Sequence, residues 1–191
     1  MNNIIYMKSQ IDFQLNYRED FLKSDKEETK ITIMENTEAM YGDDGTCDTK
    51  YCDEHNIPYY QNKLLTGTGC IIAVKGNLLL DIKRKLKDDG KAFSDKFSNA
   101  LCEYLKNKGL NSVRCDNNDV LIDNFKVASA AEVTLPTGLQ YLCYQISINQ
   151  DIETIKHACT KPMFKVPKAL SEYGITTEEM ITFCENYWTK N

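Results

Sequence analysis

The stretch "CDNNDVLIDNFKVASA", residues 115–130, carries the pattern that decides the fold. Two short segments rich in apolar residues flank the dipeptide Asp123–Asn124, and Asp and Asn favour tight turns between antiparallel strands. The sequence therefore predicts a β-hairpin. Its one basic residue, Lys126, begins the second strand among apolar and small residues, where an ammonium group would be costly to bury alone.

Lys126 allows two interpretations. Small residues that follow it, at 128–130, leave room for a ligand, and the compact charge of a lysine suits phosphate or carboxylate oxygens. Alternatively, the side chain reaches solvent or pairs with Asp119 or Asp123. On the residue pattern alone, the second interpretation is favoured.

A second unusual stretch, "KLLTGTGCIIAVKGN", spans residues 63–77. Gly67, Gly69 and Gly76 allow positive φ and a close approach of the backbone, and exposed N–H groups in such a loop can bind an anion. The pattern matches neither the Walker motif nor G-x-G-x-x-G. A plain hairpin turn is therefore the more common explanation of this stretch taken alone.

The rest of the chain shows no repeat, linker or shift in composition, so one domain spanning 1–191 is predicted. Apolar spacing, caps and breakers predict helices at 11–24, 48–56, 91–109, 151–159 and 175–188, with Asp151 as a candidate cap of the fourth. Runs rich in β-branched and aromatic residues predict strand material at 31–34, 57–65, 70–85, 112–115, 119–123, 126–133 and 140–148. This mixed order indicates an α+β sheet layered against helices.

Two of these helices carry specific expectations. In the first helix, Ile11, Leu15 and Leu22 are spaced to form the buried face. In the last helix, Thr176 and Glu179 have the spacing of a capping box.

Composition restricts the class of function. The chain holds 23 Lys and Arg against 28 Asp and Glu, a net charge of −5. The one basic run, "KRKLK" at 83–87, is predicted to be a solvated strand end or helix face, so no nucleic acid is expected as a partner. The apolar runs are far shorter than the roughly 20 residues that span a bilayer, and residues 1–12 lack a secretory pattern.

Eight cysteines without a secretory segment favour reduced thiols and a cytoplasmic location. Cys47, Cys52 and His55 form a C-x4-C-x2-H spacing that matches no common zinc pattern. Free cysteine is also a frequent small core residue. No metal site is therefore expected.

Together the two unusual stretches resemble the biotin/lipoate protein ligase superfamily, and its lipoate branch in particular. Its motifs are R-R-x-S-G-G-G-x-V-x-H-D-x-G-N and, after a helix, N-D-(L/I)-x-x-(D/N)-G-x-K-(V/I)-(S/A)-G. "TGTGCIIAVKGN" at 66–77 and "NDVLIDNFKVASA" at 118–130 align with them without a gap. The order of the other elements also follows the family, so the resemblance covers nearly the whole chain.

The resemblance implies a mixed, twisted sheet layered with helices and a site for an acyl-adenylate beneath the glycine loop. Lys126 is then the catalytic cation, which contacts the phosphate and the acyl carbonyl oxygens. Asp119 would orient the substrate amine or, with Asn118, the nucleotide. The residues implied in the acyl and phosphate pocket are Thr66, Gly67, Thr68, Gly69, Gly76 and Asn77.

The implied activity is attachment of a lipoyl or related acyl group to a lysine of a lipoyl carrier domain, through an acyl-adenylate. ATP and Mg²⁺ are implied for this ligase, with lipoate or octanoate as the acyl group. A related family of octanoyl transferases needs no ATP and takes the acyl group from an acyl carrier protein onto a cysteine. Cys159, 33 residues after Lys126, stands about where that cysteine would fall.

Several positions depart from the ligase motifs. The arginine pair is absent, and Lys63 and Leu64 stand near its place. Thr68 replaces the middle glycine, and Ala73–Val74 replaces His-Asp. These changes favour a third alternative, a non-catalytic binding protein that retains the fold. Whether the chain is an enzyme is thus open on the sequence.

Overall fold

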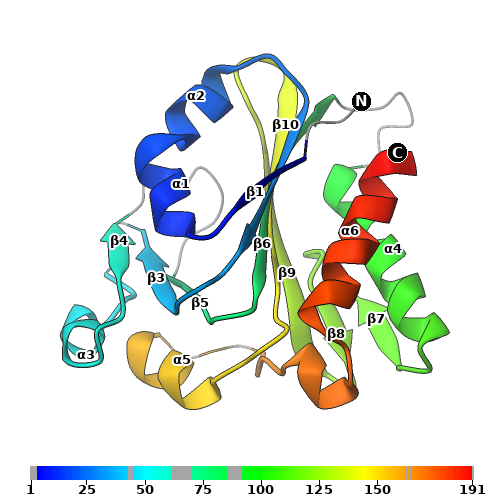
Figure 1. Cartoon of the computed structure of the whole chain (residues 1–191). Coiled ribbons are helices and arrows are strands. Elements are labelled where there is room, and N and C mark those ends of the chain that lie inside the picture. The colour runs from blue at the N-terminus through cyan, green and yellow to red at the C-terminus, as the bar shows by residue number, and fades with distance from the viewer. Residues whose placement is uncertain are drawn as a thin grey trace.

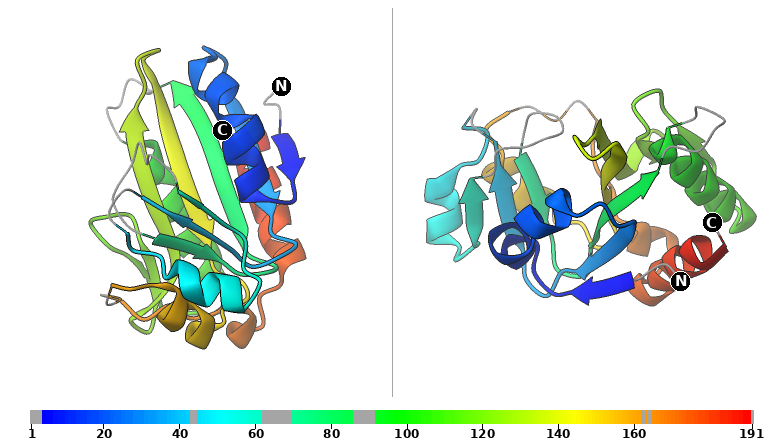
Figure 2. Two further views of the ribbon diagram at one scale, coloured as in Figure 1. Left: turned by 90° about the vertical axis from the view of Figure 1, so that its left-hand side faces the viewer. Right: turned by 90° about the horizontal axis from the view of Figure 1, so that it is seen from above.

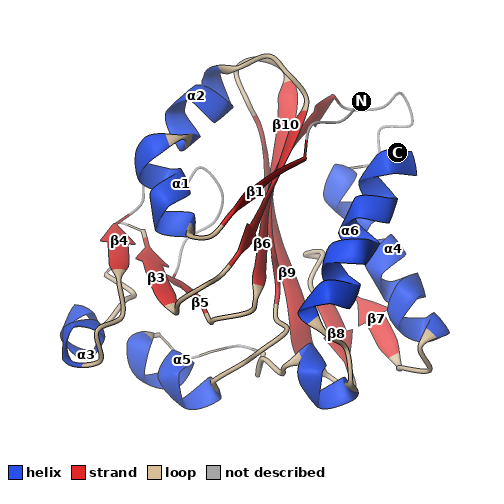
Figure 3. Cartoon of the chain, in the orientation of Figure 1, coloured by secondary structure: helices blue, strands red, loops and turns tan. Residues whose placement is uncertain are grey.

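The computed structural model describes residues 4–42, 45–61, 70–85, 92–161, 163 and 165–190, with side chains up to Trp188. Its centre is a mixed seven-stranded sheet in the order β1-β2-β6-β10-β9-β8-β7, in which only β1 and β2 are parallel. The strands are β1 (Ile4–Met7), β2 (Glu28–Ile33), β6 (Leu78–Lys85), β7 (Ser112–Arg114), β8 (Val120–Ile122), β9 (Phe125–Thr134) and β10 (Leu139–Ile146). The predicted α+β class with a mixed sheet is confirmed (Figures 1 and 3).

Two helices, α4 (Phe93–Asn107) and α6 (Thr177–Lys190), lie side by side against one face of this sheet (Figures 1 and 2). Phe97 of α4 is completely buried and packs edge-on against Tyr144 of β10 and flat against Trp188 of α6. Aromatic rings and aliphatic side chains from the sheet and both helices thus form the main core.

The opposite face of the sheet carries α1 (Gln10–Asn16) and α2 (Arg18–Lys23). Phe13 and Phe21 point inward and pack around Tyr141. The predicted buried face was wrong for Leu15, which is 59% exposed, because the chain breaks into two helices at Tyr17. Ile11 and Leu22 are partly buried and pack against small cores, as predicted. A break changes the angular position of every later side chain, so a single helical period could not describe both segments.

A smaller sheet, in the order β4-β3-β5, packs beside the large one. It consists of β3 (Glu38–Tyr41), β4 (Tyr59–Gln61) and β5 (Cys70–Ala73). Near this sheet lie α3 (Thr49–Glu54) and α5 (Ile152–Ala158), and all these elements except β4 contribute side chains to a second, smaller core (Figure 1). A short 3₁₀ helix, Leu170–Tyr173, leads into α6. The sequence patterns did not separate this second sheet from the first.

The predicted caps are confirmed. The Thr176 hydroxyl accepts a hydrogen bond from the Glu179 backbone N–H at 3.2 Å, and the Glu179 carboxylate accepts one from the Thr176 N–H at 2.9 Å. Asp151 caps α5 by accepting bonds from the N–H groups of the next turn. Because these pairings lie within one helical turn, local sequence is enough to predict them.

The prediction that "KRKLK" is solvated was wrong for its first two residues. Lys83 is completely buried and donates to the Ser24 carbonyl oxygen at 2.8 Å, beneath the Phe21 ring. Arg84 is 6% exposed and donates to Thr29. Their strand, β6, is central in the sheet and covered on both faces, so even its charged residues must find partners inside.

Among the described residues, none of the helices combines the length and apolar composition that crossing a membrane requires.

Candidate functional site

The predicted hairpin is present between β8 and β9. Asp123 and Asn124 have φ values of 50° and 70°, as a two-residue hairpin turn with both central residues left-handed demands. The pairing register then shifts, since Leu121 faces Lys126 while Val120 faces Ala128. This bulge leaves Val127 unpaired with β8 and buried in the main core, whereas Lys126 lines a cavity.

The backbone of Lys126 is bound on one side to the segment around Pro167. Its N–H donates to the Val166 carbonyl at 2.9 Å, and its carbonyl accepts from the Lys168 N–H at 3.0 Å. Its half-buried side chain has no hydrogen-bond or ion-pair partner among the described residues. The alternative that Lys126 pairs with Asp119 is wrong, because the Asp119 carboxylate pairs with Lys165 instead, at 3.2 Å.

The cavity at Lys126 has a volume of about 400 Å³. Strands β9 and β10 of the large sheet and β5 of the small sheet contribute to its wall. Further lining residues come from loops: Asn117, Asp119, Cys159, Lys161, Met163, Lys165 and Pro167. The cavity therefore lies where the two sheets meet, and no single element contains it.

One end of the cavity is charged. Lys126 and Lys165 bring two ammonium groups to it, and Asp119, which is 5% exposed, brings one carboxylate. Asp119 accepts hydrogen bonds from Lys165 and from the Asn117 amide at 3.0 Å, and both end on the same oxygen, Oδ2. Two ammonium groups against one carboxylate leave an excess positive charge, which suits an anionic ligand.

The other end of the cavity is apolar and contains thiols. Five of its lining residues belong to the second core: Cys70, Ile72, Ile155, Cys159 and Met163. The nearby Thr46 and Lys161 add a hydroxyl and a third lysine to the lining. The Cys159 backbone forms an isolated antiparallel bridge with Cys47, which anchors the end of α5 beside α3. A hydrogen bond with the Cys70 thiol lowers the pKa of Cys159, although burial acts in the opposite direction.

Three predicted site residues thus meet in one cavity: Asp119, Lys126 and Cys159. They come from the turn before β8, the start of β9 and the residue after α5. The predicted loop residues Thr66, Gly67, Thr68 and Gly69 lie outside the described residues.

Gly76 and Asn77 lie in the turn between β5 and β6 and are not among the described residues that line this cavity. The completely buried Asn77 accepts hydrogen bonds from the N–H groups of Ile148 and Asn149, each at 2.8 Å. The Gly76 N–H donates to the Met34 carbonyl at 2.9 Å. In the structure, this pair shapes the backbone after β10.

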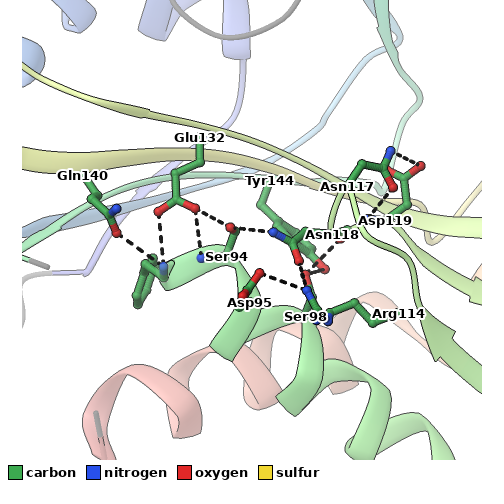
Figure 4. A network of polar contacts seen from close by, with 11 residues as sticks. Ser94, Asp95, Ser98, Arg114, Asn117, Asn118, Asp119, Glu132, Gln140 and Tyr144 are labelled. Atoms are coloured by element: carbon green, nitrogen blue, oxygen red, sulfur yellow. Dashed lines mark hydrogen bonds and ion pairs between the residues drawn. The ribbon is translucent and has the colours of Figure 1, made fainter. Parts of the chain in front are cut away.

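Asn118 faces away from the cavity, toward α4 (Figure 4). Its side-chain NH₂ group donates to the Ser94 hydroxyl at 2.8 Å, and its side-chain oxygen accepts from Arg114. Its backbone carbonyl accepts from the Ser98 hydroxyl at 2.9 Å. Its φ of 63° lies in the left-handed region, which Asn tolerates better than most residues. The Asn118–Asp119 pair therefore divides its contacts between the helix and the cavity.

Sequence reasoning missed Lys165, Asn117 and Cys70 as cavity residues. Cys70 directly follows the glycine loop and Asn117 directly precedes the predicted Asn-Asp pair, so their place beside predicted site residues could have identified both. No sequence pattern could have identified Lys165, because its segment is brought beside β9 by the bridge between Lys126 and Pro167.

Within the described part of the chain, no group of three or more His, Cys, Asp or Glu side chains is placed to hold a metal ion. The His55 Nδ1–H donates to the Tyr51 carbonyl oxygen at 2.9 Å, and the His55 ring stacks on the Tyr51 ring. Cys52 is completely buried.

The sequence matches no protein-family model and no curated protein sequence. Solved structures do match. A structure of an archaeal lipoylation system, a bi-partite lipoate protein ligase and its E2 lipoyl domain from Thermoplasma acidophilum, superposes with a TM-score of 0.80 at 15% identity. The match covers 99% of this chain and 82% of that one.

Two further structures agree with this match. LipL1 of P. falciparum in complex with lipoate gives a TM-score of 0.76 at 15% identity, over 100% of this chain and 60% of that one. Lipoate-protein ligase A bound with ATP gives 0.73 at 14% identity, over 95% and 81%. The chain has the fold of the lipoate protein ligases.

Proposed function

We propose that this chain is a single-domain enzyme that attaches a lipoyl or related acyl group to a lysine of a carrier domain. The observation that carries the proposal is the two-ended cavity around Lys126, found within the fold of the lipoate protein ligases. Structures with this fold have been determined with lipoate and with ATP, and one belongs to a system that includes an E2 lipoyl domain.

The two ends of the cavity suit the two parts of such a substrate. The hydrocarbon chain of an acid would pack against Ile72, Ile155 and Met163, and its carboxylate would face the ammonium groups of Lys126 and Lys165. A volume of about 400 Å³ is within the range of small-molecule sites. The apolar end supplies binding energy and the charged end sets the orientation.

In the ligase reaction, the acid would attack the α-phosphate of ATP, releasing pyrophosphate and forming the acyl-adenylate. A carrier lysine would then attack the acyl carbonyl and displace AMP. Lys126 would stabilise the negative charge that develops on the carbonyl oxygen in this step. Both bonds to the Asp119 carboxylate end on Oδ2, so Oδ1 would accept a hydrogen bond from the attacking amine.

The described residues do not form a Mg²⁺ site in this cavity. Mg²⁺ prefers oxygen ligands, and Asp119 is the one carboxylate among the described lining residues, where it is already paired with Lys165. No step above therefore depends on a metal held by these residues.

A second candidate is the ATP-independent transferase. Cys159 and Lys126 line the same cavity, and the pKa of Cys159 is lowered, which favours the thiolate. Cys159 would take the acyl group as a thioester from an acyl carrier protein, and a carrier lysine would then displace it.

The two reactions can be separated in one assay. The protein is incubated with a lipoyl carrier domain and either lipoate plus ATP or octanoyl-carrier protein, and the mass of the carrier domain is followed. We expect acylation with lipoate and ATP, reduced about 100-fold or more in Lys126→Ala and retained in Cys159→Ser. Lys168→Ala is the matched control. Lys168 is also a half-buried lysine, and its backbone N–H donates to the Lys126 carbonyl, but it does not line the cavity.

Acylation from octanoyl-carrier protein that is lost in Cys159→Ser would establish the transferase instead. If neither donor modifies the carrier while the folded protein still binds lipoate, the chain is the non-catalytic binding protein that retains the fold.

A further inference from the structure

Four cysteines from separate parts of the chain gather at the apolar end of the cavity. Cys159 and Cys70 line the same cavity, and both pack in the second core with Cys47 and Cys52. The Cys159 backbone is bridged to Cys47, and the Cys47 and Cys52 sulfur atoms lie 3.6 Å apart. All four are free thiols, so they form one group of cysteines at this end of the cavity.

This group extends from the cavity wall into the second core. Cys70 and Cys159 are half-buried and line the cavity, whereas Cys47 is 6% exposed and Cys52 is completely buried. A molecule in the cavity can thus reach the first two thiols directly. Free cysteines often serve as small apolar core residues, and that role is sufficient for Cys52. It does not account for two thiols on the cavity wall.

The local hydrogen bonds favour ionisation at one member of this pair. Interaction with the Cys70 thiol lowers the pKa of Cys159 and brings that of Cys47 to about 7. The same contacts raise the pKa of Cys70. Both thiols line the cavity, and the lowered pKa favours the thiolate at Cys159, with the Cys70 thiol on the same wall as a proton source.

A thiolate beside a bound acyl chain has no reaction with a saturated hydrocarbon, but it can attack a disulfide. Lipoate carries such a bond as a five-membered dithiolane ring at the end of its chain remote from the carboxylate. With its carboxylate at Lys126, that ring would lie at the thiol-lined end. We propose that Cys159 and Cys70 reduce the dithiolane ring of an acyl group bound in this cavity. The inference rests on the acyl site proposed above.

The exchange has two steps that balance. The Cys159 thiolate attacks one ring sulfur, so a Cys159–substrate disulfide forms, the ring S–S bond breaks, and the departing sulfur takes the Cys70 proton. The Cys70 thiolate then attacks Cys159 Sγ, forming the Cys70–Cys159 disulfide and releasing the second substrate sulfur, which takes a proton from solvent. One protein dithiol is oxidised and one dithiolane is reduced to a dithiol.

This chemistry would distinguish lipoyl from octanoyl groups, which share the chain length but not the ring. Either acid could occupy the cavity, but only the dithiolane would consume thiols. One turnover needs no reductant beyond the two cysteines.

The test uses the full chain, freshly reduced and freed of reductant, mixed with an equal amount of lipoate or octanoate. Remaining thiols are alkylated and counted by intact and peptide mass, and the binding of each acid is measured by calorimetry. We expect lipoate to remove two thiols, at Cys70 and Cys159, and to yield one equivalent of dihydrolipoate. Octanoate should remove none.

Single variants separate the steps. Cys70→Ser should stop at a covalent adduct of one lipoate on Cys159, and Cys159→Ser should form neither the adduct nor dihydrolipoate. Cys115→Ser, a half-buried cysteine outside the cavity lining, should behave like the wild type. Melting temperatures close to that of the wild type confirm that the variants fold.

If lipoate binds while all eight thiols remain, the exchange is wrong and the proposed acyl site stands. If neither acid binds, the acyl site itself is wrong, and the exchange with it.

Discussion

Lys126 and Asp81 are two charged residues of the same sheet in opposite surroundings. Asp81 is completely buried on β6, where its carboxylate accepts hydrogen bonds from the Gln10 amide at 2.8 Å and from the Tyr141 hydroxyl. Lys126 faces the cavity, and its ammonium group has no partner among the described residues. Donors within the protein satisfy Asp81, whereas the Lys126 ammonium group is available to a ligand.

The burial of Asp81 makes stability depend on pH. Burial raises its pKa in the folded protein above the ordinary 3.8, because the hydrogen bonds from Tyr141 and Gln10 only partly oppose the loss of hydration. The folded state then binds more protons than the unfolded state from about pH 4 upward. The free energy of unfolding should therefore fall as pH rises through that window, by up to about 1.4 kcal/mol per pH unit.

Asp81→Asn removes this titration while keeping a side chain of the same size. Urea unfolding from pH 4 to 8 should show the variant gaining stability relative to the wild type as pH rises. Parallel stability curves for the two proteins would contradict this assignment.

In the turn between β5 and β6, the residues Gly76 and Asn77 fix the path of the backbone. Gly76 has φ +85°, and a Cβ there would lie 2.0 Å from the Asn149 amide nitrogen, which donates to the Lys75 carbonyl at 3.2 Å. The Asn77 side-chain oxygen accepts hydrogen bonds from the backbone N–H groups of Ile148 and Asn149, in the loop after β10. The Gly-Asn pair thus joins the start of β6 to the loop before α5.

Gly76→Ala should destabilise the protein more than Gly138→Ala does. Both glycines have positive φ, which costs about 1–2 kcal/mol for alanine, but a Cβ at Gly138 meets nothing within 4 Å. At Gly76 the Asn149 amide must also move, at the cost of a hydrogen bond of about 1 kcal/mol. Chemical denaturation of both variants measures the difference, and equal losses would show that the Asn149 contact contributes nothing.

At the scale of the whole molecule, the last helix closes the main core. Trp188 is 1% exposed and lies flat on Phe97, with the ring centroids 5.1 Å apart. The guanidinium carbon of Arg84 lies 5.2 Å from the centroid of the Trp188 ring. The C-terminal helix thus packs on α4 and on the central strand β6 together.

Trp188→Ala should lower the free energy of unfolding by about 3–5 kcal/mol, the usual cost of truncating a buried aromatic side chain. Trp188→Phe keeps a ring against Phe97 and should lose clearly less. Thermal and urea unfolding would measure both. A small effect of the alanine variant would mean that α6 contributes little to the core.

The sequence by itself predicted the features that depend on neighbours in the chain. The Asp123–Asn124 turn, the capping box at Thr176, the cap at Asp151 and the fold class each follow from local backbone preferences or from motif order. Lys126 was also identified as the residue to test, although the pattern alone favoured a solvent-facing or paired side chain.

Only the tertiary structure decided what surrounds Lys126. The contacts that matter here join residues far apart in sequence. Asp119 pairs with Lys165, Cys70 and Cys159 line one cavity, and the buried Lys83 donates to Ser24. Such contacts arise from which strands become neighbours in the sheets and which faces are covered. Spacing along the chain carries no record of that choice, so the cavity and its thiols became visible only in three dimensions.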